Sequence, residues 1–589
     1  MEKFPCMASS LPSGQPLDVE TNTRAVLARI DEAQRKGATL LALPELCLTG
    51  CTAGDLMGFS PVPAACQRAL MNIARRTEAM AVALGLPVQI GEKIFNAAAL
   101  CENGTVKALV LKNALAPDER RIFSPGKEAN EPHGFPCPVF REGMGRIRLT
   151  SGATLTLRFL ENGQPADTDR TVLMHALPSK AGFKAHRRRL IGNVAGRGVC
   201  LWANAGANES TTDLVFDGQA IIAQADGVLN ESTPFDFQAA LWDGASVPAP
   251  FDSPPEADPM MPYAPLDQED RARWCHEAQE ICARSLATRL ERIRAKGATL
   301  GLSGGLDSAM ALLTALRAFE IAGLPKESLF AVTLPAFGSG ARTRGNAEAL
   351  LSALGLPLRT IDISRSVLQH FKDIGHREDL LDATFENAQA RERTQVLMDK
   401  ANSLGGLMIG TGDMSELALG FTTFGGDHMS MYSVNAGLYK TALRLIIAQI
   451  ANDTKNQALS CALLSILDTP VSPELLPSSK AELSQKTEEI VGPYLLNDFF
   501  LHHVLLGNAS PSHLLEEAQS AFAGRYGQKE IIDRMRGFFS RFFAAQFKRS
   551  CMPDGPQVLS VSLSPRGGLH MPSDAACALW HSAIDALEQ

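Results

Sequence analysis

The sequence predicts an α/β protein built from two regions. Apolar runs alternate with amphipathic helix patterns in both halves of the chain, which is typical of parallel or mixed sheets covered by helices. A proline-rich segment separates the two halves. Hydrophobic residues make up 45% and charged residues 20% of the 589 residues, so the chain can form several sizeable cores.

In the first half, residues 21–36 predict an amphipathic helix, because Val26, Ile30 and Ala33 fall on one face. The apolar run over residues 38–46 predicts a strand directly after it. In the second half, residues 268–294 predict a long helix. A short strand candidate, ATLG, and an apolar helix beginning near Ser308 follow it. Each half therefore contains the alternation of strands and helices expected of an α/β layer.

Between Gly244 and Pro265 the chain contains seven prolines. Each proline fixes φ and lacks a backbone donor, so this segment is unsuited to helix or interior strand. It predicts an extended linker. The predicted organisation is one domain over residues 1–244, a linker over residues 245–265, and a second domain over residues 266–589.

Charge and composition exclude several classes of function. The formal net charge of −8 argues against general nucleic-acid binding, which requires a surplus of Lys and Arg. No apolar run approaches the ~18 residues that span a bilayer, and the first twenty residues lack the apolar region of a signal peptide. The twelve cysteines show no CxxC spacing, so neither a disulfide framework nor a zinc site is indicated. We expect a cytoplasmic enzyme with no nucleic-acid partner and no membrane partner.

The motif with the clearest chemistry lies between the strand candidate ATLG and the apolar helix after it. Its adjacent glycines allow a tight turn and close approach to a ligand, and the following helix N-terminus suits an anionic phosphate. A carboxylate beside phosphate is explained if it helps to hold Mg²⁺. The alternative is a turn that only caps the helix. The motif comprises Gly301, Leu302, Ser303, Gly304, Gly305, Leu306, Asp307 and Ser308.

The sequence SGGLDS within this motif resembles the phosphate-binding loop of the N-type ATP pyrophosphatases. Members of that family cleave ATP to AMP and pyrophosphate while they adenylate an oxygen of the substrate. Further segments narrow the resemblance to NAD synthetase, namely residues 385–402, 406–441, 546–556 and 564–575. In the last of these, Gly568, Leu569 and His570 stand where the family more often has Asp-Trp-Arg. The overall pattern is similar to the large bacterial glutamine-dependent enzymes, in which a nitrilase-like glutaminase supplies ammonia to the synthetase.

This resemblance implies an ATP-dependent ligase that amidates deamido-NAD to NAD through an adenylate. It implies a nitrilase-like α/β/β/α sandwich followed by a doubly wound parallel-sheet domain. Asp307 and Glu416 are the implied Mg²⁺ ligands, and residues 301–308 together with Thr411 are the implied ATP site. The implied deamido-NAD contacts are Asn387, Arg391, Glu416, Phe421, Thr422, Thr423, Phe424 and Lys548.

The first half resembles the nitrilase superfamily, which uses a Glu base, a Lys that stabilises the oxyanion and a Cys nucleophile. Residues 41–50 match the segment of the general base and identify it as Glu45. Residues 109–126 match the next segment and identify Lys112 and a second acid, Glu119. The nucleophile segment corresponds to residues 152–163, where Leu157, Arg158, Phe159 and Leu160 are the candidate equivalents.

None of these four side chains is a nucleophile, and the sequence has no cysteine between Cys137 and Cys200. We therefore expect that the first domain no longer hydrolyses glutamine by the family mechanism. Cys47 and Cys200 are the remaining candidates, and both favour buried, unreactive positions in apolar runs. Glu45 and Lys112 are then expected to persist as a structural ion pair.

The nitrogen source is accordingly expected to be free ammonia. The alternatives are ammonia from a separate glutaminase, and glutamine hydrolysis by an atypical nucleophile in this chain. A nitrilase-type amidohydrolase and a non-catalytic relative are the competing classes. The resemblance further implies a homo-oligomer, with an octamer as one candidate assembly.

Overall fold

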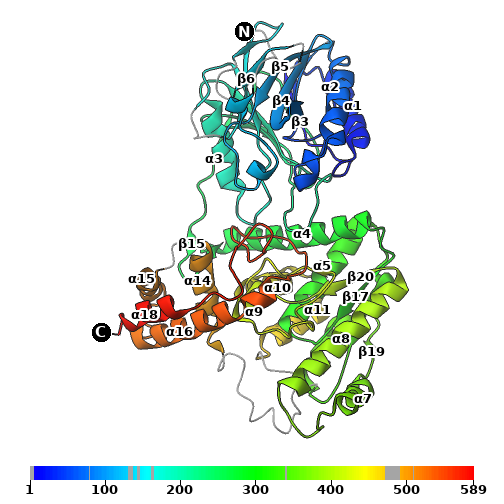
Figure 1. Cartoon of the computed structure of the whole chain (residues 1–589), viewed down its shortest axis with the longest axis vertical. Helices are drawn as coiled ribbons and strands as arrows, with labels where there is room; N and C mark the ends of the chain where they lie inside the picture. Colours follow the sequence, from blue (N-terminus) through cyan, green and yellow to red (C-terminus); the bar gives the residue numbers. More distant parts are fainter. Residues whose placement is uncertain are drawn as a thin grey trace. The chain divides into compact units, whose positions relative to one another are not determined.

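The computed structural model describes residues 5–78, 80–129, 135, 137–141, 146–160, 165–338, 341–470, 491–507 and 510–588. The chain divides into two compact units (Figure 1). The first unit contains Met1–Ser179, Phe183–Ser210 and Leu214–Pro254, and the second contains Lys180–Gly182, Thr211–Asp213 and Pro255–Gln589. Over the described ranges, no helix has both the length and the apolar composition needed to cross a membrane.

The first unit contains two seven-stranded sheets. The first sheet has the strand order β13 (Ala240–Trp242), β1 (Cys6–Ala8), β2 (Leu40–Ala42), β3 (Ala81–Ile90), β4 (Lys93–Glu102), β5 (Thr105–Leu111) and β6 (Val139–Arg141). The second has the order β14 (Ala249–Pro250), β12 (Gly227–Glu231), β11 (Ala220–Gln224), β10 (Val199–Ala203), β9 (Arg170–Met174), β8 (Thr154–Phe159) and β7 (Ile147–Arg148). The helices of this unit are α1 (Val19–Arg35), α2 (Pro61–Ala74) and α3 (Lys184–Ala195), with short 3₁₀ turns at Gly54–Gly58, Glu119–Arg121 and Gly126–Glu128.

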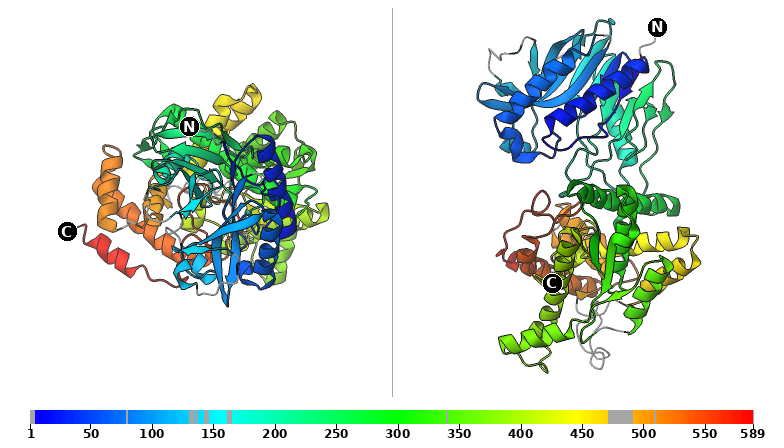
Figure 2. Two further views of the ribbon diagram at one scale, coloured as in Figure 1. Left: turned by 90° about the horizontal axis from the view of Figure 1, so that it is seen from above. Right: turned by 90° about the vertical axis from the view of Figure 1, so that its right-hand side faces the viewer.

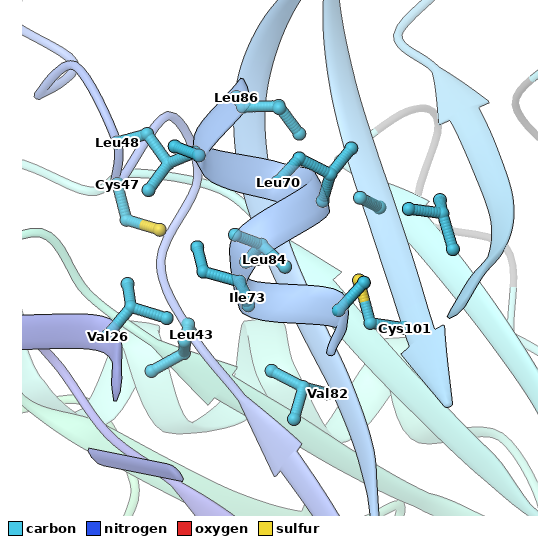
Figure 3. Packing of buried hydrophobic residues seen from close by; sticks show 14 of the residues in the cluster. Val26, Leu43, Cys47, Leu48, Leu70, Ile73, Val82, Leu84, Leu86 and Cys101 are labelled. Atoms are coloured by element: carbon cyan, nitrogen blue, oxygen red, sulfur yellow. The ribbon is translucent and has the colours of Figure 1, made fainter. Parts of the chain in front are cut away.

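Alternating side chains arrange these elements in four layers. In β2, Leu40 and Ala42 enter a core between the two sheets, whereas Leu41 enters a core shared with α1 and α2. Figure 3 shows the second of these cores, where Val26 of α1 and Ile73 of α2 face the strand residues. A third core joins α3 to the second sheet. The order helix, sheet, sheet, helix confirms the predicted α/β/β/α sandwich, and Figure 2 shows its layers from two further directions.

The predicted elements of this half are present with shifted ends. The helix predicted over residues 21–36 is α1, which begins earlier because Asp18 accepts a hydrogen bond from the Thr21 N–H and caps it. The strand predicted over residues 38–46 is the shorter β2. Pro44 has no N–H with which to continue the ladder, which explains the early end of the strand.

The segment predicted as an extended linker, residues 245–265, contains short paired strands. Strand β14 pairs with β12 at the edge of the second sheet, and β15 (Ala257–Asp258) pairs with β16 (Met261–Pro265). Proline is compatible with these edge positions because its missing donor faces away from the ladder. The two units divide within this segment, between Pro254 and Pro255.

The second unit is built on five parallel strands in the order β19-β18-β17-β20-β21. The strands are β17 (Ala298–Gly301), β18 (Leu329–Thr333), β19 (Arg359–Thr360), β20 (Leu407–Gly410) and β21 (Tyr432–Ser433). The helices are α4 (Gln268–Arg292), α5 (Leu306–Ala322), α6 (Ala341–Ala353), α7 (Ser364–Ile374), α8 (Ala383–Leu404), α9 (Met414–Leu419), α10 (Lys440–Asp453), α11 (Gln457–Leu467), α14 (Tyr494–Leu505), α15 (Pro511–Ala521), α16 (Gln528–Ala544), α17 (Gln546–Arg549) and α18 (Ala578–Asp585), with a 3₁₀ turn at Lys326–Ser328.

This strand order is doubly wound, as predicted. The chain moves from β17 outward to β19, then returns to the other side of β17 with β20. Right-handed crossovers therefore place α5 and α8 on opposite faces of the sheet. The order reverses between β17 and β20, and ligands of such folds bind beyond the carboxyl ends of the strands at this point. The loops after β17 and β20 contain residues 301–308 and Thr411, respectively.

Candidate active site

The predicted phosphate loop connects β17 to the N-terminus of α5. Its conformation depends on Gly304, which has φ +88°, and a Cβ there would lie 1.9 Å from the Thr343 carbonyl oxygen. Ser303 Oγ accepts the Gly305 N–H at 3.1 Å and lies 3.1 Å from Ser308 Oγ. Gly305 is the N-cap of α5 and provides no side chain to occupy the first N–H groups of the helix. These groups are suited to an anion at this end of α5.

A cluster of four charged side chains lies beside this loop. Lys440 Nζ is 2.7 Å from Asp307 Oδ1, 2.7 Å from Asp413 Oδ2 and 2.8 Å from Glu416 Oε1. Asp307 lies in the first turn of α5, Glu416 lies in α9, and Lys440 begins α10. Asp413 is the N-cap of α9 and accepts the Glu416 N–H through its other oxygen at 2.9 Å. We call these four residues the charge cluster.

The charge cluster has three carboxylates for one ammonium group. Burial raises the pKa of Glu416 to about 7 even though Lys440 opposes this shift, and burial also raises the pKa of Asp413. Burial disfavours the charge on Lys440, but the three acids hold its pKa well above the usual range. An excess of negative charge in a buried site favours the uptake of a cation.

The donor set of the charge cluster fits a hard divalent cation. One oxygen from each of Asp307, Asp413 and Glu416 lies within 4.8 Å of the others. Mg²⁺ prefers carboxylate and phosphate oxygens, and the phosphate loop adjoins the cluster. The structure thus brings together the two predicted metal ligands, Asp307 and Glu416, and adds Asp413.

A cavity of about 480 Å³ opens over the phosphate loop and the charge cluster. Thirteen of the predicted ATP and deamido-NAD residues line it, namely residues 301–303 and 305–308 together with Asn387, Thr411, Glu416, Phe421, Thr422 and Thr423. Gly304, Arg391, Phe424 and Lys548 do not line this cavity. Most of the predicted ligand contacts therefore converge on one site.

Three predicted ligand contacts lie outside the cavity lining and hold or flank the loop after α9. They are Arg391, Phe424 and Lys548. Lys548 Nζ donates to the Gly420 carbonyl at 2.7 Å and also to the Thr422 carbonyl. Arg391 Nε donates to the Phe424 carbonyl at 3.2 Å. The Phe424 ring is partly exposed and stacks on His428. These contacts fix the backbone of residues 420–424 at the edge of the cavity.

Sequence reasoning missed Asp413 and Lys440. Both lie in the segment 406–441 that carried the resemblance, and each had a local signal. Asp413 immediately precedes a helix pattern, which is typical of an N-cap. Lys440 directly precedes the apolar run of α10 and is buried, and a buried lysine requires partners.

The first unit contains a second buried charge group. Lys112 Nζ lies 2.9 Å from Glu45 Oε1 and 2.8 Å from Glu119 Oε1. Glu45 also accepts hydrogen bonds from Asn96 Nδ2 and from the Ala176 N–H, each at 2.8 Å. Burial opposes the charge of Glu45, but Lys112 and its other partners hold the pKa of this carboxyl below its usual value. The three predicted glutaminase residues are thus together and paired.

Close packing supports this group. Gly85 of β3 lies against the segment that carries Glu45, and a Cβ there would lie 2.6 Å from Glu45 Cα. Any larger residue would displace the carboxylate from Lys112. The position of Glu45 therefore depends on glycine at residue 85.

An aromatic ring faces the ammonium group of Lys112. Of the four candidates for the nucleophile position, Phe159 is the residue whose ring lies over Lys112 Nζ, at 5.6 Å from the ring centroid. Phe159 ends β8 and is buried in the core between the sheets. A phenyl ring has no group that can attack an amide carbon.

Cys47 and Cys200, the two remaining candidates for a nucleophile, are buried as predicted. Cys47 lies in the core of Figure 3 and contacts the Gly85 carbonyl, with Sγ to oxygen at 3.6 Å. Cys200 lies in the core under α3. Burial raises the pKa of each thiol to about 12, so neither forms a thiolate readily at neutral pH. Burial and nearby Glu209 also raise the pKa of Cys51 well above its usual value.

Known proteins resemble this chain over nearly its whole length. Residues 278–481 match the family model for NAD synthase, and residues 8–147 match the model for carbon-nitrogen hydrolase. The glutamine-dependent NAD(+) synthetases of Mycobacterium leprae and of Mycobacterium tuberculosis (strain ATCC 25618 / H37Rv) are each 31% identical to this chain. Each alignment covers 96% of this chain and 96% of the relative.

Two solved structures share the fold. The glutamine-dependent NAD(+) synthetase of Cytophaga hutchinsonii has a TM-score of 0.78 at 19% identity, with both chains covered completely. The enzyme of Acinetobacter baumannii, in complex with adenosine diphosphate, has a TM-score of 0.65 at 18% identity, covering 96% of this chain and 97% of that one. The likeness therefore covers the folds of both units.

Replacing Lys440 by Met should destabilise the second unit by about 3–5 kcal/mol, because three buried carboxylates then lose their cation. Mg²⁺ should recover part of this loss, since it can replace the missing charge. Hydrogen exchange in α10 during urea unfolding measures both effects. The control is K372M at an exposed lysine of α7, which should change stability by less than about 0.5 kcal/mol. Equal losses in the two variants would contradict the assigned contacts.

Alkylation of the native chain by iodoacetamide should modify the exposed Cys461 and Cys551 and leave Cys47 and Cys200 unmodified. Their burial and raised thiol pKa values are the reason. Peptide mass spectrometry measures the labelling, and all four cysteines should react once the chain is unfolded. Labelling of Cys47 or Cys200 at the rate of Cys551 would identify a reactive thiol in the first unit.

Proposed function

The chain belongs to the family of glutamine-dependent NAD(+) synthetases, and on that basis we propose that it makes NAD from deamido-NAD and ATP with free ammonia as its nitrogen source. The synthetase activity is carried by the cavity, the phosphate loop and the charge cluster of the second unit. The proposal that free ammonia is the nitrogen source rests on one observation, which is that the Phe159 ring lies over Lys112.

The proposed reaction has two steps. A carboxylate oxygen of the nicotinate group attacks the α-phosphorus of ATP, and pyrophosphate leaves. Ammonia then attacks the acyl carbon of the adenylate, the bond to the AMP oxygen breaks, and one nitrogen proton is lost. The products are NAD, AMP and pyrophosphate.

The first step brings several anions together, and the site is built to offset their repulsion. The N-terminus of α5 and the hydroxyl groups of Ser303 and Ser308 can bind phosphate oxygens. Lys440 is held by Asp307, Asp413 and Glu416, which prevents it from turning away from the phosphate loop. A positioned cation stabilises charge that develops on the transferred group.

Asp307, Asp413 and Glu416 are the residues that would hold Mg²⁺. When bound, the ion would supply charge stabilisation for the phosphate oxygens of ATP. The support is the chemistry of the donor set and its three oxygens within 4.8 Å.

The loop of residues 420–424 is the proposed binding site for deamido-NAD. Thr423 Oγ1 donates to Asn387 Oδ1 at 2.9 Å, and Lys548 binds two carbonyls of this loop. In this arrangement Lys548 shapes the loop that contacts the dinucleotide. Asn387 and Arg391 connect the loop to α8.

Deamido-NAD, ATP and ammonia are thus the proposed small-molecule partners, with glutamine only as a source of ammonia made by a separate glutaminase. The family resemblance also implies a homo-oligomer. Analytical ultracentrifugation of the full chain would measure its size.

With ammonium chloride, deamido-NAD, ATP and Mg²⁺, the chain should form NAD. With ammonia-free glutamine the rate should be at least ~10³-fold lower, because the position facing Lys112 has no nucleophile. Chromatographic detection of NAD and of glutamate from glutamine measures both reactions. Comparable rates would overturn the proposed nitrogen source, and C47S, C51S and C200S would then identify an atypical nucleophile. No NAD with either donor would overturn the synthetase assignment.

Removal of divalent cations should lower NAD formation by about 10²-fold or more, because the charge on the phosphates is no longer offset. Mg²⁺ should restore the rate. D307N and E416Q should each raise the Mg²⁺ concentration required for half-maximal activity. The control is E320Q, an exposed carboxylate at the far end of α5, which should leave that concentration unchanged. A full rate in EDTA would contradict the metal site.

A further inference from the structure

Asp498 of α14 is a buried carboxylate outside the predicted site. Its side chain is not part of the charge cluster and does not line the cavity. Its two oxygens nevertheless contact α9 and α10. These helices carry Asp413, Glu416 and Lys440 of the charge cluster. Ser415 Oγ donates to Asp498 Oδ1 at 2.5 Å, and the Thr441 N–H and hydroxyl donate to Oδ2 at 3.0 and 2.5 Å.

The first contact fixes α9. Ser415 stands between Asp413 and Glu416 in sequence and is buried. Its hydroxyl donates to Asp498 and its oxygen accepts the Lys440 N–H at 2.8 Å. The hydroxyl of Ser415 therefore joins α9, α10 and α14 at one point.

The second contact caps α10. The N-cap residue of this helix is Tyr439, whose side chain makes no capping hydrogen bond. The first two N–H groups of the helix belong to Lys440 and Thr441, and they are bound by Ser415 Oγ and Asp498 Oδ2. A carboxylate at this end also interacts favourably with the helix dipole. Helix α10 thus obtains its cap from two other helices.

Helix α14 has a second residue on the same face. Tyr494 lies one turn before Asp498, and Lys440 Nζ lies 5.4 Å from the centroid of its ring. One face of α14 therefore supports both the backbone and the ammonium group of Lys440. The family model for NAD synthase ends at residue 481, before this helix begins.

We infer that Asp498 is a positioning residue, which acts through Lys440 by fixing the first turn of α10 against α9. The inference rests on the proposed synthetase activity. Because reacting groups must be held within a fraction of an ångström, loss of this carboxylate should lower the rate of the chemical step. Its effect should be transmitted by Lys440 and should not depend on substrate contacts of Asp498 itself.

The test is a double-mutant cycle on NAD formation from ammonium chloride with the full chain. D498A should lower kcat by ~10²-fold and D498N by ~10-fold, because the amide keeps an acceptor for Thr441 but loses the charge. KM values for ATP and deamido-NAD should change little, since Asp498 touches neither ligand site. K440R keeps the charge but moves it, and D498N should cost much less in that background than in the wild type.

The matched control is N497S, at the adjacent buried residue of α14, whose side-chain amide donates to the Val491 and Gly492 carbonyls. It should lower the melting temperature without lowering kcat per folded molecule. Equal and additive effects of D498N in both backgrounds would overturn the inference and assign Asp498 a purely structural role. An inactive wild type would instead overturn the proposed function.

Discussion

The contact between Lys440 and its three carboxylates constrains the whole second unit. Separating Lys440 from the three carboxylates would leave buried charge uncompensated, so the elements that carry these groups must stay together. Asp307 comes from the β17 side of the strand switch, and Asp413 and Glu416 come from the β20 side. Lys440 therefore joins the two loops between which ligands of doubly wound sheets bind. The phosphate loop, the cavity and the support from α14 all depend on this arrangement.

The first unit contains a comparable group of charged residues. Glu45, Lys112 and Glu119 satisfy one another in a buried site, and Asn96 and a backbone N–H complete the set. Loss of Lys112 would leave the two carboxylates without their cation at substantial cost. Folding alone is thus enough to explain why these residues are present without a nucleophile. In the charge cluster of the second unit, Asp307 and Glu416 line an open cavity, so these groups can contact a ligand.

Hydrophobic periodicity and one contiguous motif predicted the alternation of strands and helices and the phosphate loop. The resemblance to known families supplied the sandwich and the other predicted residues of the cavity, but many residues that line it were not predicted. Neither the patterns nor the resemblance revealed Asp413, Lys440 or Asp498, whose roles come from contacts between helices distant in sequence. The sequence does not show the partners of Lys440 and Asp498, because these partners lie on other helices. The strand pairing of the proline-rich segment could not be predicted for a related reason. Edge strands tolerate proline when the partner strand is elsewhere in the chain.

The Phe159 ring has an evolutionary consequence. It fills space in the core between the sheets as well as covering Lys112. Substituting a small thiol residue would leave a void, and replacement of a buried phenyl group by a small side chain typically costs about 3–5 kcal/mol. It would also place a second ionisable group beside a lysine whose charge is already balanced. If free ammonia is the nitrogen source, as proposed, a change to glutamine hydrolysis would therefore require several coordinated substitutions.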